Sequence, residues 1–216
     1  MNKTDLKLYA ITDRQWLHGA RLCEHVKLAI EGGATMIQIR DKDILSTDSD
    51  AGLKDEYNEA LEIKRICHEH KVPLIINDNV QFAIDIDADG VHLGQDDMNP
   101  AEARKLLGTD KIIGVTAKTV EQAKRAEVDG ADYLGSGAVF GSTTKLNAKP
   151  MTKGLLREIT AAVDIPVVAI GGINADNAVT LNGTGIAGIA VVGAIFASAD
   201  IKAAAKELAK ICDEIL

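Results

Sequence analysis

Eight short runs rich in β-branched residues alternate with longer amphipathic stretches, and this alternation constrains the fold more than any other feature. The expected strands are Leu6–Thr12, Thr35–Arg40, Leu74–Asn77, Gly90–Leu93, Ile112–Thr116, Tyr133–Gly137, Val167–Ile170 and Gly188–Val192. Helical spacing of apolar residues is clearest in Ala20–Glu31, Leu53–His70, Val120–Val128 and Lys202–Ile215. Strands that alternate with helices of this size indicate parallel βαβ units, and eight units can close into a barrel without exposed edges. We therefore predict an α/β protein with one (β/α)8 barrel domain spanning residues 1–216.

Length and composition agree with that prediction. The chain has 216 residues, at the short end for such a barrel, and it contains no Pro/Ser-rich linker that would mark a domain boundary. Apolar residues make up 46% and aromatic residues only 3%, so the core is expected to be aliphatic, as in parallel sheets buried on both faces. The alternative, an open doubly wound sheet, usually carries a G-x-G-x-x-G turn after its first strand, whereas here that strand ends in ITDR.

Charge and cysteine content narrow the class of partner. The net charge of −8 argues against general binding to nucleic acid or anionic membranes and favours small-molecule ligands. Cys23, Cys67 and Cys212 have no metal-ligand spacing and are interpreted as reduced packing residues. With no signal-peptide pattern and no apolar run of spanning length, we expect a cytoplasmic protein. The oligomeric state is left open.

The second predicted strand carries unusual polar residues. In MIQIRDKD, Gln38, Arg40 and Lys42 are spaced two apart, so they share one face at increasing height toward the carboxyl end of the strand. The ordinary explanation for such polar residues is that the strand lies at a solvent-exposed edge of a sheet, but a closed barrel has no edge strand. A glutamine between two isoleucines also needs a polar partner. Because catalytic groups of barrels gather at the carboxyl ends of the strands, we predict a functional site here.

Carboxylates follow the next two strands. Asn77 and Asp78 end the run PLIINDN, and Asp97 follows GVHLGQ closely. Asp78 and Asp97 are predicted to share one Mg²⁺, which accepts a few protein oxygens and keeps waters or phosphate oxygens. The competing interpretation of Asn77 and Asp78 is a helix N-cap. His92, within the fourth strand, is interpreted as a hydrogen-bonded packing residue in preference to a ligand.

Two later segments suit phosphate binding. GSGAVFGSTTKLNAKP, after the sixth strand, offers hydroxyls, backbone N–H groups and Lys145, although a plain surface loop has the same composition. Gly171, Gly172 and Gly193 follow strands seven and eight, where barrels often hold a phosphate. No Ser/His/Asp or Cys/His arrangement stands out, so the site is expected to bring two phosphorylated ligands together by proximity and charge neutralisation.

These motifs resemble one known family, the thiamine phosphate synthases, over nearly the whole chain. The segments that carry the resemblance are YAITDR, GATMIQIRDKD, PLIINDN, DGVHLGQDD, IIGVTAKT, DYLGSGAVFGSTTK, VVAIGGIN and GIAVVGAIF. The resemblance implies a barrel enzyme that transfers a pyrimidinylmethyl group from its diphosphate to a thiazole phosphate, in a dissociative reaction assisted by Mg²⁺. In such a reaction the methylene–oxygen bond breaks first and the thiazole nitrogen then attacks without a general base.

The resemblance also implies roles for individual residues. The positions that match the pyrimidine diphosphate site are Gln38, Arg40, Lys42, Asn77, Thr116 and Lys145, of which Arg40, Lys42, Thr116 and Lys145 would be catalytic. Metal ligands would be Asp78 and Asp97. The positions that match the thiazole phosphate site are Ser142, Thr144, Gly172, Val192 and Gly193.

Two of these positions depart from the family's usual residues, and other functions remain open. Thr116 stands where serine is common and keeps the hydroxyl, whereas Gly193 stands where many members have serine and lacks that contact. The alternatives are a thiazole tautomerase, which needs neither the diphosphate nor a metal, a phosphosugar isomerase, which needs a strand-end base, and a phosphate-binding sensor without turnover. The presence of Gln38, Arg40 and the paired carboxylates favours the synthase.

Overall fold

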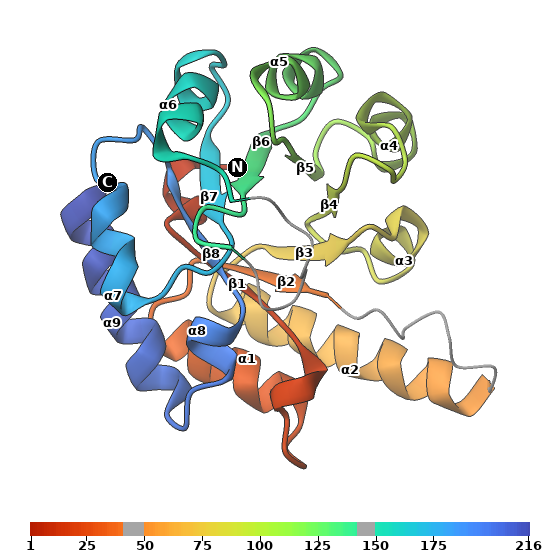
Figure 1. Cartoon of the computed structure of the whole chain (residues 1–216). Coiled ribbons are helices and arrows are strands. Elements are labelled where there is room, and N and C mark those ends of the chain that lie inside the picture. The colour runs from red at the N-terminus through yellow and green to blue at the C-terminus, as the bar shows by residue number, and fades with distance from the viewer. Residues whose placement is uncertain (41–49, 142–149) are drawn as a thin grey trace.

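Eight parallel strands close into a barrel in the order in which they occur along the chain. The computed structural model describes residues 1–40, 50–141 and 150–216, with residues 50–54 described by their backbone alone. In Figure 1 the strands follow one another around the centre of the molecule. Their bounds are β1 Leu8–Ile11, β2 Met36–Ile39, β3 Leu74–Asn77, β4 Gly90–Leu93, β5 Ile112–Thr116, β6 Tyr133–Gly137, β7 Val167–Ile170 and β8 Gly188–Val191. The predicted fold class is confirmed.

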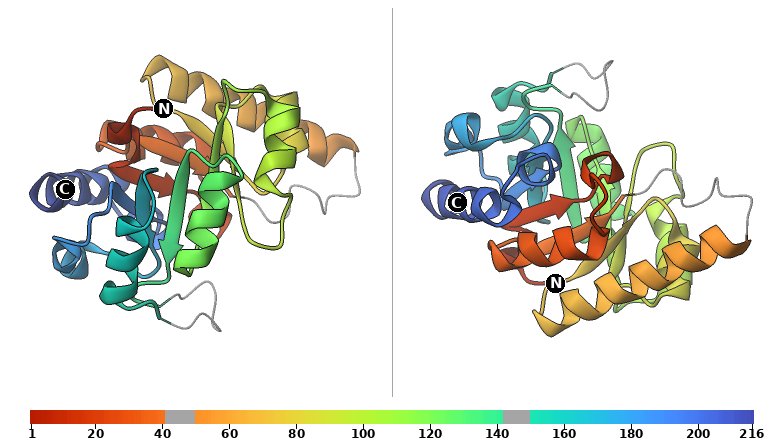
Figure 2. Two further views of the ribbon diagram at one scale, coloured as in Figure 1. Left: turned by 90° about the horizontal axis from the view of Figure 1, so that it is seen from above. Right: turned by 90° about the horizontal axis from the view of Figure 1, so that it is seen from below.

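Helices surround the barrel on its outside (Figures 1 and 2). The α-helices are α1 Leu22–Glu31, α2 Asp50–Glu69, α3 Val80–Asp85, α4 Pro100–Leu107, α5 Val120–Val128, α6 Lys153–Ala161, α7 Ala175–Ala178, α8 Gly193–Phe196 and α9 Ile201–Ile215. Short 3-10 turns are η1 Lys3–Leu6, η2 Arg14–Trp16 and η3 Val179–Leu181. Figure 2 shows α1 and α2 lying side by side along the barrel wall. Among the described residues, no helix combines the length and apolar character needed to cross a bilayer.

The strand predictions hold closely: β2 is one residue shorter than predicted at each end, β8 is one residue shorter at its carboxyl end, and the larger correction lies at the start of the chain. Strands β3 to β7 have the predicted bounds, but β1 begins at Leu8 because Leu6 belongs to the 3-10 turn η1. Leu6 is fully buried and joins the side chains inside the barrel. A Cβ on Gly188 would lie 1.8 Å from the Leu6 carbonyl oxygen, so this glycine lets the turn approach β8. The apolar residue thus caps the amino end of the barrel and does not extend the strand.

Side chains alternate between two cores. One core lies between the barrel wall and the helices, and the other fills the barrel interior. The interior members are Leu6, Tyr9, Ile11, Met36, Ile75, Ile112, Tyr133, Val168, Ala187 and Ala190. Tyr133 fits because its neighbour across the ladder is Gly114, whose added Cβ would lie 2.1 Å from the Tyr133 Cζ atom. The interior is therefore a packed core with two phenols in it.

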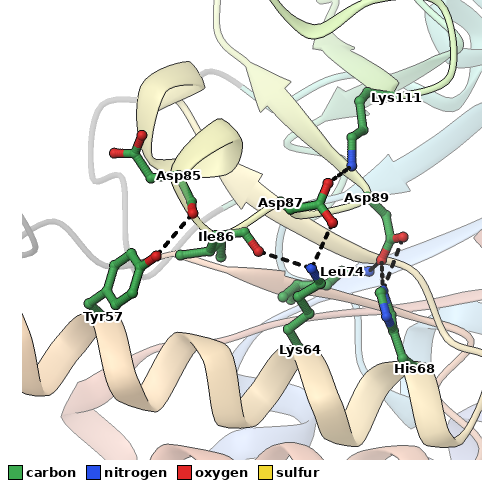
Figure 3. Close-up of polar contacts among 9 residues, drawn as sticks. All are labelled: Tyr57, Lys64, His68, Leu74, Asp85, Ile86, Asp87, Asp89 and Lys111. Atoms are coloured by element: carbon green, nitrogen blue, oxygen red, sulfur yellow. Dashed lines mark hydrogen bonds and ion pairs between the residues drawn. The ribbon is translucent and has the colours of Figure 1, made fainter.

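A group of ion pairs ties α2 to the amino ends of β3, β4 and β5 (Figure 3). Asp87 accepts hydrogen bonds from Lys64 on α2, at 2.9 Å, and from Lys111 before β5, at 2.5 Å. Asp89 accepts from the Leu74 backbone N–H, at 2.8 Å, and contacts the His68 ring. These contacts lie at the end of the barrel opposite the carboxyl ends of the strands, where barrel residues serve stability.

The Asp87 contacts give a pH-dependent contribution to stability. The hydrogen bond from Lys111, followed by that from Lys64, lowers the pKa of Asp87 from 3.8 to about 2. The stabilisation is therefore complete above about pH 4 and is lost as pH falls through about 2. Because the side chain is 72% exposed, Asp87→Asn is expected to cost less than about 1 kcal/mol near neutral pH. Asparagine tolerates the positive φ of 51° at this position.

Urea unfolding at pH 7 and at several values between 4 and 2 measures this effect. The difference in the free energy of unfolding between wild type and Asp87→Asn should become smaller as pH falls. Asp85→Asn is the matched control, because Asp85 is exposed and, among the described residues, its carboxylate accepts a hydrogen bond from the neutral Gln81 side chain at 2.8 Å in place of an ion pair. A difference that stays constant with pH would contradict the assignment.

Candidate active site at the carboxyl end of the barrel

Three of the predicted polar residues point into the barrel near its carboxyl end. Gln38 lies two residues after Met36, Asn77 two after Ile75, and Thr116 four after Ile112, and those three apolar residues belong to the interior core. Since residues two or four apart in a strand share a face, the polar side chains extend the same inward columns toward the rim. Gln38 is 1% exposed, whereas Asn77 and Thr116 are half-buried.

A continuous chain of hydrogen bonds joins Gln38 to Thr116 across the interior. Gln38 Nε2 donates to Tyr9 OH at 2.5 Å, and Tyr9 OH lies 2.9 Å from Tyr133 OH. Tyr133 OH lies 3.0 Å from His92 Nδ1, and His92 Nε2 lies 3.0 Å from Thr116 Oγ1. The buried amide predicted to need a polar partner therefore has one, and the chain links β2, β1, β6, β4 and β5.

His92 is hydrogen-bonded, as the sequence interpretation expected, but both tyrosines were missed. His92 is hydrogen-bonded through both ring nitrogens, as a satisfied interior residue should be. Burial is the main cause that raises the pKa of Tyr9 and of Tyr133 above the usual value, so both phenols stay protonated. The available signal was a tyrosine within an aliphatic strand in YAITDR and in DYLGSG. Hydropathy alone could not distinguish a phenol packed against Ile and Val from one hydrogen-bonded in a site.

Arg40 follows β2 directly and is held at the rim by its backbone. Its N–H donates to Thr12 Oγ1 at 3.1 Å, while the Thr12 N–H donates to the Gln38 carbonyl at 2.9 Å. Thr12 is 1% exposed, so it fixes where the chain leaves the barrel wall. Arg40 is half-buried and lies two residues beyond Gln38, as the spacing predicted. Lys42 lies outside the described residues.

The local geometry shows that other residues than the predicted metal ligands cap the helices after β3 and β4. The N-cap of α3 is Asn79, whose side chain accepts from the Phe82 N–H at 2.9 Å, and the N-cap of α4 is Asn99. The capping explanation for Asn77 and Asp78 is therefore wrong. Asp78 instead has a left-handed backbone, with φ of 61°, and its N–H donates to the His92 carbonyl at 2.9 Å.

The two carboxylates have the chemistry of a partial Mg²⁺ shell. Asp78 Oδ2 accepts from Asn77 Nδ2 at 2.5 Å, and Asp97 Oδ2 accepts from the Gly94 N–H at 2.6 Å. Both follow adjacent parallel strands, whose register pairs Asn77 with His92. No group of three or more acidic, histidine or cysteine ligands occurs among the described residues. Two carboxylates fit a magnesium ion that keeps waters and accepts phosphate oxygens from a ligand.

The glycine-rich turn after β7 packs on the segment after β6. Gly171 and Gly172 have φ of 100° and 67°. The Phe140 N–H donates to the Gly171 carbonyl at 2.9 Å, and Asn177 Nδ2 donates to the Gly172 carbonyl at 2.8 Å. A Cβ on Gly172 would lie 2.7 Å from the Phe140 carbonyl oxygen, so this close approach requires glycine.

The last strand leads straight into the short helix α8. Val192 is its N-cap, and the N–H groups of Gly193 and Ala194 lie in the first turn, where no intrahelical acceptor exists. Gly193 has an ordinary backbone conformation, and a Cβ added there would come no closer than 3.9 Å to the Ala197 Cβ. The glycine is therefore not required sterically. Ser142, Thr144 and Lys145 lie outside the residues that the structure describes.

A closed parallel barrel with polar side chains converging at the carboxyl ends of its strands has the architecture of a (β/α)8 enzyme. The sequence matches the family model described as thiamine monophosphate synthase over residues 8–195. The thiamine-phosphate synthase of Ruminiclostridium cellulolyticum is 47% identical over 210 residues, covering 97% of each chain. That of Clostridium novyi is 48% identical over 206 residues, covering 95% of this chain and 98% of its own.

A solved structure agrees with the sequence comparisons. Thiamine phosphate pyrophosphorylase from Pyrococcus furiosus superposes with a TM-score of 0.87 at 39% identity, covering 99% of this chain and 98% of its own. The chain belongs to the thiamine monophosphate synthase family, and it is a transferase of thiamine biosynthesis. The resemblance drawn from the sequence motifs is confirmed.

Two glycine substitutions test the geometry of the proposed phosphate turns. Gly172→Ala is expected to lower the free energy of unfolding by about 1–3 kcal/mol, because the residue has positive φ and a crowded Cβ position. Gly193→Ala, the matched control, should change it by less than about 0.5 kcal/mol. Urea denaturation followed by circular dichroism measures both. Equal losses in the two variants would show that the difference in backbone geometry does not matter.

Proposed function

We propose that this enzyme transfers the 4-amino-2-methylpyrimidin-5-ylmethyl group from its diphosphate to the nitrogen of 4-methyl-5-(2-phosphoethyl)thiazole, releasing pyrophosphate. The observation that carries the proposal is the convergence of Gln38, Asn77 and Thr116 at one rim, beside two carboxylates that cap no helix. The names and identities of the relatives support the same reaction. The two substrates would meet over the carboxyl end of the barrel.

The pyrimidine would bind against Gln38. One N–H of the amide is used by Tyr9, which leaves the second N–H and the carbonyl oxygen. A donor and an acceptor side by side complement the ring nitrogen and amino group of an aminopyrimidine. Thr116, at the other end of the hydrogen-bonded chain, would lie near the methylene carbon that reacts.

Cationic side chains would hold the diphosphate. Arg40 is at the rim, and Asn77 adds an amide. Lys42 and Lys145, outside the described residues, are assigned to the same task from the sequence. Mg²⁺ bound by Asp78 and Asp97 would supply charge neutralisation for the departing pyrophosphate. The acidic surface, with its net charge of −8, makes these local cations necessary for binding a polyanion.

The thiazole phosphate would bind at the glycine turns after β7 and β8. Backbone N–H groups of Gly172 and Gly193, next to Val192, would donate to the phosphate, and the Gly193 N–H lies in the first turn of α8, where no intrahelical acceptor exists. The Gly171–Gly172 turn packs on Phe140, which precedes Ser142 by two residues in the sequence. Those two hydroxyls are assigned to the same phosphate from the sequence.

The proposed reaction needs neither a nucleophile nor a general base from the protein. The methylene–oxygen bond breaks, the electron-rich pyrimidine stabilises the cation, and the thiazole nitrogen attacks. That nitrogen carries no proton, so no general base is needed. The residues of this chain bind and align the two rings and stabilise negative charge on the leaving group.

The direct test is an assay of the purified protein with both heterocycles and Mg²⁺. We expect pyrophosphate and thiamine phosphate in equal amounts, and no product after chelation of the metal. A thiazole tautomerase would act without the diphosphate or the metal. A sensor would bind ligand without turnover. Either of those results would contradict the proposed transfer reaction.

Loss of the cations assigned to the diphosphate should slow turnover. Arg40→Ala and Lys145→Ala are each expected to reduce kcat by about 100-fold or more, because charge stabilisation of a leaving group is lost. Arg65→Ala is the control, since Arg65 is exposed on α2 and pairs only with Glu69 among the described residues. Steady-state release of pyrophosphate measures all three. Wild-type rates in the first two variants would rule out their assigned roles.

A further inference from the structure

The hydrogen-bonded chain in the barrel has one self-consistent direction. In this structure the Gln38 amide faces the Tyr9 hydroxyl with Nε2 and not with Oε1, so Gln38 donates this hydrogen bond, and each phenol has one proton to give. If Tyr9 donates to Tyr133, then Tyr133 donates to His92 Nδ1, and the proton on His92 Nε2 is donated to Thr116 Oγ1. Each hydrogen bond between Gln38 and Thr116 then has one donor and one acceptor, and each phenol accepts once and donates once.

The opposite direction leaves a buried proton without an acceptor. If Tyr133 donated to Tyr9, the Tyr9 oxygen would accept from both Gln38 and Tyr133. Its own proton would then have no partner among the described residues. Tyr9 is 1% exposed, so that hydroxyl would be unpaired in the interior, which is costly. The first direction is therefore favoured.

The direction determines what Thr116 offers to a ligand. With His92 donating from Nε2, the Thr116 oxygen is an acceptor inside the chain. Its own proton is then available for donation toward the mouth of the barrel. At the Gln38 end of the chain, the Tyr9 hydroxyl accepts from the NH₂ group of Gln38. This hydrogen bond keeps the NH₂ group directed toward β1 and so fixes the orientation of the amide. Both ends face the region where the pyrimidine is proposed to bind.

We propose that Tyr133 is a positioning residue of the transfer reaction, which holds His92 in its Nε2–H tautomer and thereby fixes Thr116 as a donor to the bound pyrimidine substrate. This role rests on the proposed function, because it needs Gln38 and Thr116 to contact that substrate. Tyr133 is fully buried beneath the rim and acts through Tyr9 and His92 without touching the ligand.

The barrel is built to hold this phenol in one place. Gly114 leaves room for the Tyr133 ring, and Gly135 leaves room for His92, whose Cε1 would lie 3.0 Å from a Cβ there. The Tyr133 ring meets Tyr9 edge-on, with centroids 5.9 Å apart, and lies at 36° to His92 at 5.5 Å. Phenylalanine at position 133 would keep these ring contacts and remove only the hydroxyl.

Kinetics of Tyr133→Phe test the proposal. We expect kcat/KM for the pyrimidine diphosphate to fall about 5- to 30-fold, as when one or two oriented hydrogen bonds are lost, with KM for the thiazole phosphate within about twofold of wild type. Tyr57→Phe is the matched control, because the Tyr57 hydroxyl donates to the Asp85 carbonyl at 3.0 Å between α2 and α3, outside the barrel interior (Figure 3). It should leave both constants unchanged.

The tautomer of His92 is a second readout that needs no turnover. In protein labelled with ¹⁵N-histidine, the signal assigned by its loss in His92→Gln should show a protonated Nε2 and an unprotonated Nδ1. Tyr133→Phe should convert it to a mixture of tautomers. A merely structural role for Tyr133 would lower stability without moving this signal.

The outcomes separate the two proposals. Absence of synthase activity in wild type, with the Nε2–H tautomer present, would overturn the proposed function and with it the catalytic role of Tyr133, while leaving the hydrogen-bond direction supported. Wild-type His92 protonated on Nδ1 would overturn the inference whether or not Tyr133→Phe folds. Unchanged kinetics in a folded Tyr133→Phe enzyme would overturn it as well.

Discussion

Closure of the barrel between β1 and β8 is the constraint from which the rest of the structure follows. The register that pairs Leu8 with Ile189 completes a ring in which the backbone hydrogen bonds of each strand are shared with two neighbours. In a closed ring every strand residue faces either the interior or the helices. The interior is too narrow for eight columns of large side chains, so large and small residues must alternate around it. Glycines at 90, 114, 135 and 188 are the small partners that this closure needs.

The same constraint explains why polar chemistry can exist inside an aliphatic protein. Gln38, His92 and two phenols would be costly in a dry core if any of them lacked a partner. They come from four strands at different heights of the interior, with Tyr133 at the start of β6, and they satisfy one another in a single chain that ends at Thr116, the last residue of β5. The amino end of the same interior is plugged by Leu6 and held from outside by the Asp87 ion pairs. The amino end therefore contributes to stability, and the carboxyl end carries the candidate site.

Much of the site could be predicted because it depends on strand periodicity. Gln38 and Arg40 lie two residues apart and emerge at the same rim, as the alternation of side chains in a strand requires. Asp78 and Asp97 follow adjacent strands, which the order of the chain already implies in a parallel barrel. Capping was harder, since Asn77, Asp78 and Asn79 are all plausible caps by residue type, and only the hydrogen bond from the Phe82 N–H identifies Asn79. Tyr9 and Tyr133 could not be recognised, because their meeting depends on positions 124 residues apart.

The sequence by itself determined the barrel, the family and the rim at which the candidate site is proposed, because hydrophobic periodicity and local motifs act over a few residues and need no knowledge of distant contacts. Only the tertiary structure decided which polar groups satisfy each other inside the barrel and where the glycines make room. It also decided that Asn79, and not Asn77 or Asp78, caps α3. Those outcomes depend on the register between neighbouring strands and on packing across the interior, and neither quantity is set by any single segment of the chain.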